Sequence, residues 1–81
     1  MEIEEMFEQV KTEVATLRRL SFRDGFIVRD LFPLGLWYSH PQDIRTRLGA
    51  MVFNWVDSEA CSYMVPAGKT DKNQEIYRIV G

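Results

Sequence analysis

The stretch from Ser39 to Ser58, SHPQDIRTRLGAMVFNWVDS, decides the fold, because its apolar residues recur at helical spacing. Successive apolar positions fall three or four residues apart, which predicts an amphipathic helix of about residues 41–58. Ser39 and Gln42, three residues apart, fit a capping box at its start. The apolar stripe consists of Ile44, Leu48, Met51, Val52, Trp55 and Val56.

The rest of this helix is polar and basic. Its opposite face carries Thr46, Arg47 and Asn54, and Arg45 lies in the same first half. Phe53 falls at the border of the stripe, where it would meet a second layer or a partner. Gly49 costs a helix interior about 1 kcal/mol relative to alanine, so we expect another element to approach closely there.

An acidic helix is predicted at the start of the chain, over about residues 2–19. Residues 1–13 hold five glutamates against one lysine, whereas the remaining chain holds nine Lys+Arg against seven Asp+Glu. A mildly basic body therefore follows an acidic helix. The apolar stripe of this helix comprises Ile3, Met6, Phe7, Val10, Val14 and Leu17.

Short elements are predicted between the two helices. Asp24-Gly25 indicates a turn, and residues 26–28 form a β-rich run. Asp30 is placed to cap a short helical segment of residues 31–34, which Gly35 would end.

The tail predicts a β-hairpin within residues 62–80. Residues 63–65 and 76–80 read as strands, and the polar residues 66–74 join them. If the run at residues 26–28 pairs with the hairpin, a three-stranded sheet packs on the helices. The chain is then a single α+β domain, residues 1–81, with the order of a winged helix-turn-helix, and the hairpin is its wing.

Composition excludes several classes of protein. The chain has 81 residues, a net charge of −2 and 46% hydrophobic residues, which excludes a disordered chain and a two-domain enzyme. Cys61 alone forms no internal disulfide, and no Cys/His cluster offers a zinc site. The acidic N-terminus is no signal peptide, and no apolar run spans a membrane. The single cysteine makes a reducing cytoplasm the expected location.

Enzymatic chemistry finds no support in the motifs, and no cofactor is expected. Gly68-Lys69-Thr70 resembles the end of a P-loop, but Tyr63 stands where the motif needs glycine. His40 has no convergent nucleophile and is better explained as a helix-start residue. Five aromatic residues would serve as core or, less economically, as a base-stacking platform: Phe26, Phe32, Trp37, Trp55 and Tyr77.

One family resemblance covers about residues 22–80. It rests on the runs FIVRDLF (26–32), RLG (47–49) and GKT (68–70), with Trp37, Arg45, Phe53, Val56, Asn73-Gln74 and Ile76-Tyr77. The pattern resembles an uncharacterised family of small bacterial domains, the domain of unknown function numbered fourteen-thirteen. Members are short and look like cargo of phages and other mobile elements. The resemblance implies that the Arg-bearing helix and the hairpin loop belong to one design, and it implies no activity.

The first hypothesis is a winged-helix-like nucleic-acid-binding or transcription-regulatory protein. In such a fold the long helix and the hairpin loop converge, so arginines grip bases or phosphates and loop lysines contact phosphate. So few cations predict weak binding to double-stranded DNA unless the protein forms a homodimer. The alternative for these residues is an Arg47–Asp43 pair and a merely solvated loop. The predicted contact residues are Arg45, Thr46, Arg47, Asn54, Lys69, Lys72 and Asn73.

The second hypothesis is a protein-interaction module, such as an inhibitor or adaptor encoded by a mobile element. Its acidic first helix would meet a basic surface of a host protein or mimic nucleic acid. The residues assigned to this contact are Glu4, Glu5, Glu8 and Phe53.

Overall fold

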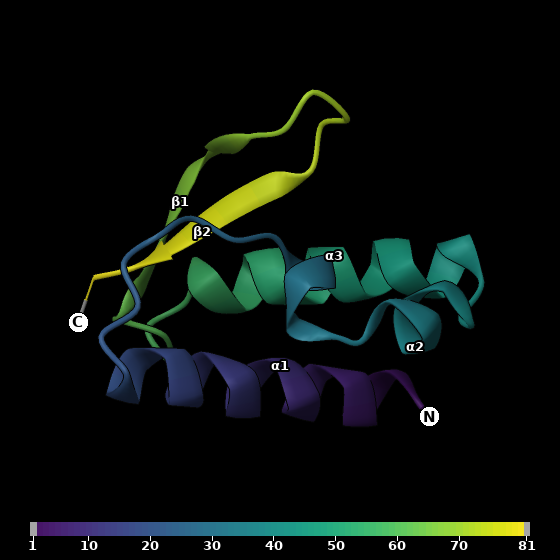
Figure 1. Cartoon of the computed structure of the whole chain (residues 1–81), viewed down its shortest axis with the longest axis horizontal. Coiled ribbons are helices and arrows are strands. Elements are labelled where there is room, and N and C mark those ends of the chain that lie inside the picture. The colour runs from purple at the N-terminus through teal and green to yellow at the C-terminus, as the bar shows by residue number, and fades with distance from the viewer. Residues whose placement is uncertain (1, 81) are drawn as a thin grey trace.

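The computed structural model describes residues 2–80 and confirms the α+β class. It has three α-helices, a short 3-10 helix and a two-stranded antiparallel sheet (Figure 1). α1 packs along one side of α3, and the hairpin lies on the other side (Figure 1). In chain order the elements are α1 (Ile3–Arg19), η1 (Val28–Leu31), α2 (Leu34–Tyr38), α3 (Gln42–Val56), β1 (Met64–Lys69) and β2 (Glu75–Ile79).

The two long helices form where the apolar spacing predicts them. α1 matches its predicted range to within one residue, and α3 ends two residues earlier than expected. The predicted capping box of α3 is wrong, because Pro41 occupies the cap position and Ser39 ends α2 instead. The Ser39 hydroxyl donates to the carbonyl of Leu36 at 2.6 Å, which satisfies an acceptor at the end of α2.

The segment between α1 and α3 differs from the prediction. The expected strand at residues 26–28 is reduced to a single bridge, in which Phe26 and Tyr77 exchange N–H···O bonds of 2.9 and 2.8 Å. Asp30 does not cap a following helix, because its carboxylate accepts from the Ile27 N–H at 3.1 Å and closes η1. Pro33 occupies the N-cap position of α2 without a capping hydrogen bond, and Gly35 lies inside this helix.

The predicted hairpin forms, but β1 (Met64–Lys69) is longer than the strand expected at residues 63–65. β1 continues through Lys69, and the register shifts between Pro66 and Lys69, which pairs with Glu75. Gly68 has φ +119°, a conformation that glycine adopts without strain and that suits a β-bulge. The remaining loop is closed by hydrogen bonds between Thr70 and Gln74.

The core lies between α1, α3 and the hairpin. Its centre contains the fully buried Met6, Val10, Val14, Leu48 and Val52. Of the five aromatic residues assigned to the core, four are buried and Trp55 is half-buried, with edge-to-face contacts to Phe7 and Tyr63. These rings therefore serve mainly in packing.

Candidate nucleic-acid interface

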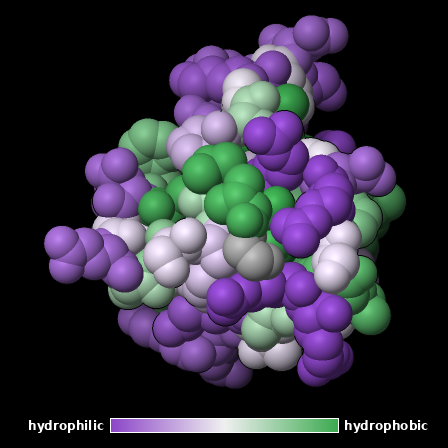
Figure 2. Space-filling model, turned by 90° about the vertical axis from the view of Figure 1, so that its left-hand side faces the viewer, coloured by the Kyte–Doolittle hydropathy of each residue, from purple (hydrophilic) through white to green (hydrophobic). Residues whose placement is uncertain are grey.

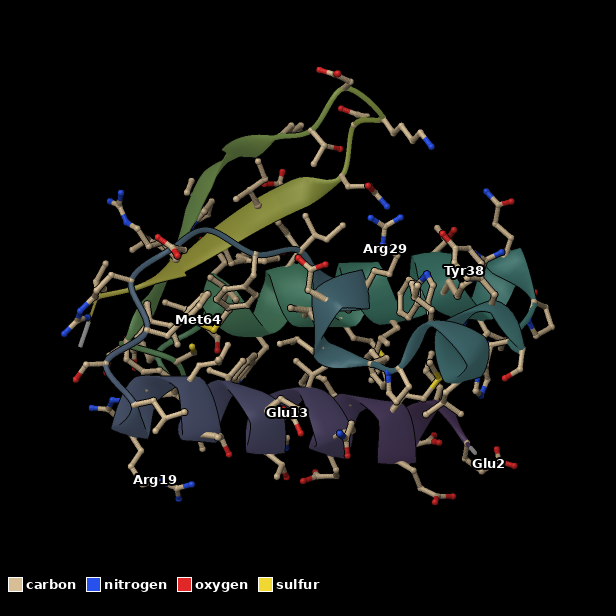
Figure 3. The ribbon with its side chains drawn as sticks, in the orientation of Figure 1. Glu2, Glu13, Arg19, Arg29, Tyr38 and Met64 are labelled. Carbon is tan, nitrogen blue, oxygen red and sulfur yellow. The ribbon has the colours of Figure 1, made fainter. Side chains whose placement is uncertain are left out.

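A cleft of about 640 Å³ separates the first half of α3 from the hairpin loop. The segment from Ile27 to Tyr38 forms its third wall. In Figure 3, Arg29 points from η1 toward the hairpin, and Tyr38 stands above the junction of α2 and α3. The polar residues that line the cleft are Arg29, Tyr38, Gln42, Arg45, Thr46, Lys72, Asn73, Gln74 and Glu75.

Two arginines meet at the ring of Tyr38. The Arg29 guanidinium donates from Nη1 to the Tyr38 hydroxyl at 3.2 Å. The Cζ atom of Arg45 lies 5.2 Å from the centroid of the same ring, which is cation–π distance. Tyr38 is nevertheless 56% exposed, so an oriented aromatic ring remains accessible beside two positive charges.

The charge of the cleft is not neutralised by its own walls. The ion pairs recorded among residues 2–80 are Lys11–Glu8 and Lys69–Glu75, and neither involves a cleft arginine. Glu75 is the one carboxylate in the lining described, and Lys69 lies 3.7 Å from it. Arg29, Arg45 and Lys72 therefore leave the cleft with a positive balance.

The buried Nε atom of Arg45 is energetically unfavourable. This atom has no hydrogen-bond partner, a state that no other buried side-chain N or O of residues 2–80 shares. An unpaired buried donor costs about 1–3 kcal/mol, and more when it belongs to a charged group. A buried donor without a partner is rare in folded proteins.

The hairpin loop has a defined shape. Asn73 has φ +65°, and its N–H donates to the Thr70 carbonyl at 2.9 Å. The Thr70 hydroxyl accepts from the Gln74 N–H at 3.2 Å. The exposed Lys72 is thus presented from a closed turn rather than from an open loop.

The structure brings together four of the seven predicted nucleic-acid contacts. Arg45, Thr46, Lys72 and Asn73 line the cleft, whereas Arg47, Asn54 and Lys69 are exposed outside its lining. Arg45 and Arg47 diverge because residues two apart point about 200° apart on a helix. Lys69 is engaged by Glu75 instead.

Arg29, Tyr38 and Gln42 are cleft residues that sequence reasoning missed. Arg29 directly follows the run predicted as a strand, and no local pattern marks it as a cleft residue. Tyr38 was hidden because Gly35 suggested a helix end, whereas α2 continues to Tyr38 and places it beside α3.

Gly49 also lines the cleft. The prediction that another element approaches it closely is wrong, because a Cβ atom built there meets nothing within 4 Å. The missing side chain instead leaves open space on the side of α3 that faces the hairpin loop.

The acidic residues of the second hypothesis lie on α1, across α3 from the hairpin (Figure 1). Glu4, Glu5 and Glu8 are exposed and line a shallow depression, and Glu8 pairs with Lys11 at 2.8 Å. Phe53 is 42% exposed on α3 and lies outside both linings. The acidic and cationic surfaces are therefore separate.

A third surface lies at the end of the molecule formed by the last turn of α1 and the residues that follow β2. Apolar side chains gather in the middle of this end (Figure 2), and the large exposed apolar residues of these segments are Leu20 and Val80. Neither Leu20 nor Val80 lines the cleft, so this apolar surface is separate from it.

Groups suited to other chemistry are dispersed. Within residues 2–80, no three His, Cys, Asp or Glu side chains are grouped to hold a metal ion. Cys61 is buried, and this burial raises the pKa of its thiol. The Nδ1 atom of His40 lies 2.9 Å from the Leu36 carbonyl oxygen, in keeping with a role at a helix boundary. None of the helices described has the length and apolar character of a membrane span.

Comparison with known proteins gives no relative. The chain matches no protein-family model, no curated protein and no solved structure. The family resemblance therefore stays a prediction, and the cleft has to be interpreted from its own geometry.

Proposed function

We propose that this protein is a nucleic-acid-binding domain of winged-helix type, with a transcription-regulatory role in the cytoplasm. The observation that carries the proposal is the convergence of three cations from separate segments on one cleft: Arg29 from η1, Arg45 from α3 and Lys72 from the hairpin loop. The order of elements supports it, because Phe26 bridges β2 where a winged helix places its first strand.

The chemistry of the cleft suits phosphate. Arginine donates charge-assisted hydrogen bonds to phosphate oxygens, and lysine acts as a mobile point charge. Three contacts predict a fall of log K with log salt of slope roughly −2 to −3, which is shallow. Binding would be strongest at low salt, and a homodimer would double the number of contacts.

The test is a titration of labelled mixed-sequence oligonucleotides, duplex and single-stranded, followed by fluorescence anisotropy at low salt. Arg45→Ala should weaken binding roughly tenfold, the loss expected for a hydrogen bond to a charged group. Arg47→Ala is the matched control, because it removes the same charge from the same helix outside the cleft. No binding by the wild-type chain, or equal losses in the two variants, would overturn the proposal.

The second candidate function is the protein-interaction module, and the exposure of Glu4, Glu5 and Glu8 along α1 favours it. In this role the domain acts as an inhibitor or adaptor, and the basic surface of a host protein binds to α1. This contact does not involve the cleft. The discriminating experiment is recovery of a partner from nuclease-treated host lysate by the wild-type chain and by a variant with all three glutamates changed to glutamine. A partner retained equally by both chains would exclude this surface.

A further inference from the structure

The position of Arg45 and Thr46 bears on the kind of nucleic acid that the cleft accepts. Both residues lie on the side of α3 that faces the hairpin loop, which forms the opposite wall of the cleft. A helix that reads a duplex must project into a major groove about 12 Å wide. Here the arginine lies inside a concavity instead, so the surface around it suits a ligand thinner than a duplex.

We propose that the cleft holds one unpaired nucleotide of a single-stranded nucleic acid, with its base against Tyr38 and its phosphates at Arg29 and Arg45. This inference rests on the proposed function and specifies its ligand. The shared chemistry of a free nucleotide and a strand is an aromatic base joined to a phosphate. Lys72, on the opposite wall, would contact the continuing backbone and so favours the strand.

The ring of Tyr38 is suited to stacking. Arg29 fixes its hydroxyl at 3.2 Å and Arg45 lies over the ring, while more than half of the residue remains exposed. Exposed aromatic rings beside arginines bind the bases of single strands, because every base offers a π-face. Neither arginine contact removes the tyrosine from solvent, so the arrangement orients the ring without burying it.

The phosphate end is suited to a dianion or a backbone diester. Two guanidinium groups converge on one tyrosine, and no carboxylate of residues 2–80 forms an ion pair with either. The buried Nε of Arg45 makes no hydrogen bond, and the guanidinium is held by its contact with the Tyr38 ring. A phosphate between the two guanidinium groups offsets the charge that the fold leaves uncompensated.

The space suits a nucleotide as well. A volume of about 640 Å³ falls within the range of roughly 300–1,000 Å³ that small-molecule sites occupy. The amides of Gln42 and Asn73 reach the lining from opposite walls and can pair with base edges. Gly49, on the same wall as Gln42, adds no side chain to the cleft.

The experiment compares Tyr38→Phe and Tyr38→Ala in anisotropy titrations with a labelled strand of about 12 nucleotides, a length within the usual site sizes. The same strand annealed to its complement provides the duplex arm. Unlabelled adenosine monophosphate is the competitor that separates free nucleotide from strand. Phe53→Ala is the matched control, because it removes a partly exposed aromatic ring outside the cleft.

We expect the single strand to bind more tightly than the duplex. Tyr38→Ala should weaken it roughly fivefold or more, which corresponds to loss of one stacked base. Tyr38→Phe should keep most of the affinity, since it retains the ring, and Phe53→Ala should bind as the wild type does. Competition by adenosine monophosphate at concentrations comparable with the strand would assign the site to free nucleotides instead.

The outcomes separate this inference from the proposed function. If the wild type binds neither strand nor duplex, the proposed function fails. If it binds but prefers the duplex, or if Tyr38→Ala binds the strand as well as the wild type, nucleic-acid binding survives and the unpaired-nucleotide site is wrong. Circular dichroism of each variant verifies that the fold is intact.

Discussion

The two sides of α3 differ in what they do with their side chains. Toward α1 the helix buries Leu48 and Val52 against Met6 and Val10, all at most 1% exposed. Toward the hairpin loop it places Arg45 with an unpaired buried Nε and leaves Tyr38 largely exposed nearby. On the α1 side the apolar side chains are buried against each other. On the other side a charged group lacks a hydrogen-bond partner and an aromatic ring remains exposed. From this contrast we expect substitutions on the α1 side of α3 to change mainly stability, and substitutions in the cleft to change mainly the proposed binding.

The largest effect that tests this division is expected from Leu48→Ala. Leu48 is fully buried in the core, and truncating such a leucine costs about 2–5 kcal/mol through lost burial and the cavity left behind. Urea unfolding followed by circular dichroism measures the change. Asn54→Ala on the exposed surface of the same helix should shift stability by no more than about 0.5 kcal/mol. Equal effects of the two substitutions would contradict the core assignment.

Tyr77 belongs to both sides, since its buried ring joins the core and also lines the cleft. Burial, with Glu75 nearby, raises the pKa of its hydroxyl to about 12 from the ordinary value of 10. A raised pKa in the folded state means that the unfolded chain loses its proton first as pH rises. Stability is therefore fully present below pH 10 and declines between pH 10 and about 12, by on the order of 2 kcal/mol.

Tyr77→Phe isolates this contribution. The pKa values of Tyr63 and Cys61 are also raised by burial, so both chains lose some stability in alkali. The wild type should lose more than the variant between pH 10 and 12, as measured by urea unfolding at each pH. Identical pH profiles would show that the hydroxyl titrates as in the unfolded chain.

The sequence predicts the α1 side better than the hairpin side for a physical reason. Apolar residues every three or four positions dictate a helix and its buried face, so the ranges of α1 and α3 follow directly. The segment from Phe26 to Tyr38 depends on single contacts, such as the Asp30 carboxylate on the Ile27 N–H, that leave no periodic pattern.

The same difference explains why the sequence predicts some residues of the cleft and misses others. Arg45 and Lys72 lie on elements whose pairing could be anticipated from a helix followed by a hairpin. Arg29 and Tyr38 line the cleft because Arg29 of η1 contacts Tyr38, and Tyr38 at the end of α2 contacts Arg45 of α3, which is a tertiary outcome. Their partnership with Arg45 has no local sequence signature.

Gly49 sharpens the comparison, because stability and binding should change in opposite directions there. A Cβ at this position meets open space, so Gly49→Ala should stabilise the helix by about 1 kcal/mol. The added methyl group enters the cleft lining and should weaken oligonucleotide binding. Thermal unfolding and anisotropy measure the two effects on the same sample. A gain in stability with unchanged affinity would mean that the ligand does not reach this part of α3.

The smallest effect is expected at Lys72, which lines the cleft from the hairpin loop. This lysine is exposed in the hairpin loop and makes no ion pair among residues 2–80, so its removal should leave stability within about 0.5 kcal/mol of the wild type. If it contacts one phosphate, Lys72→Ala lowers the slope of log K against log salt by roughly 0.7 to 0.9. Arg19→Ala, at the exposed end of α1, is the control and should leave that slope unchanged. A slope that falls equally in both variants would mean that overall charge, rather than the cleft, governs binding.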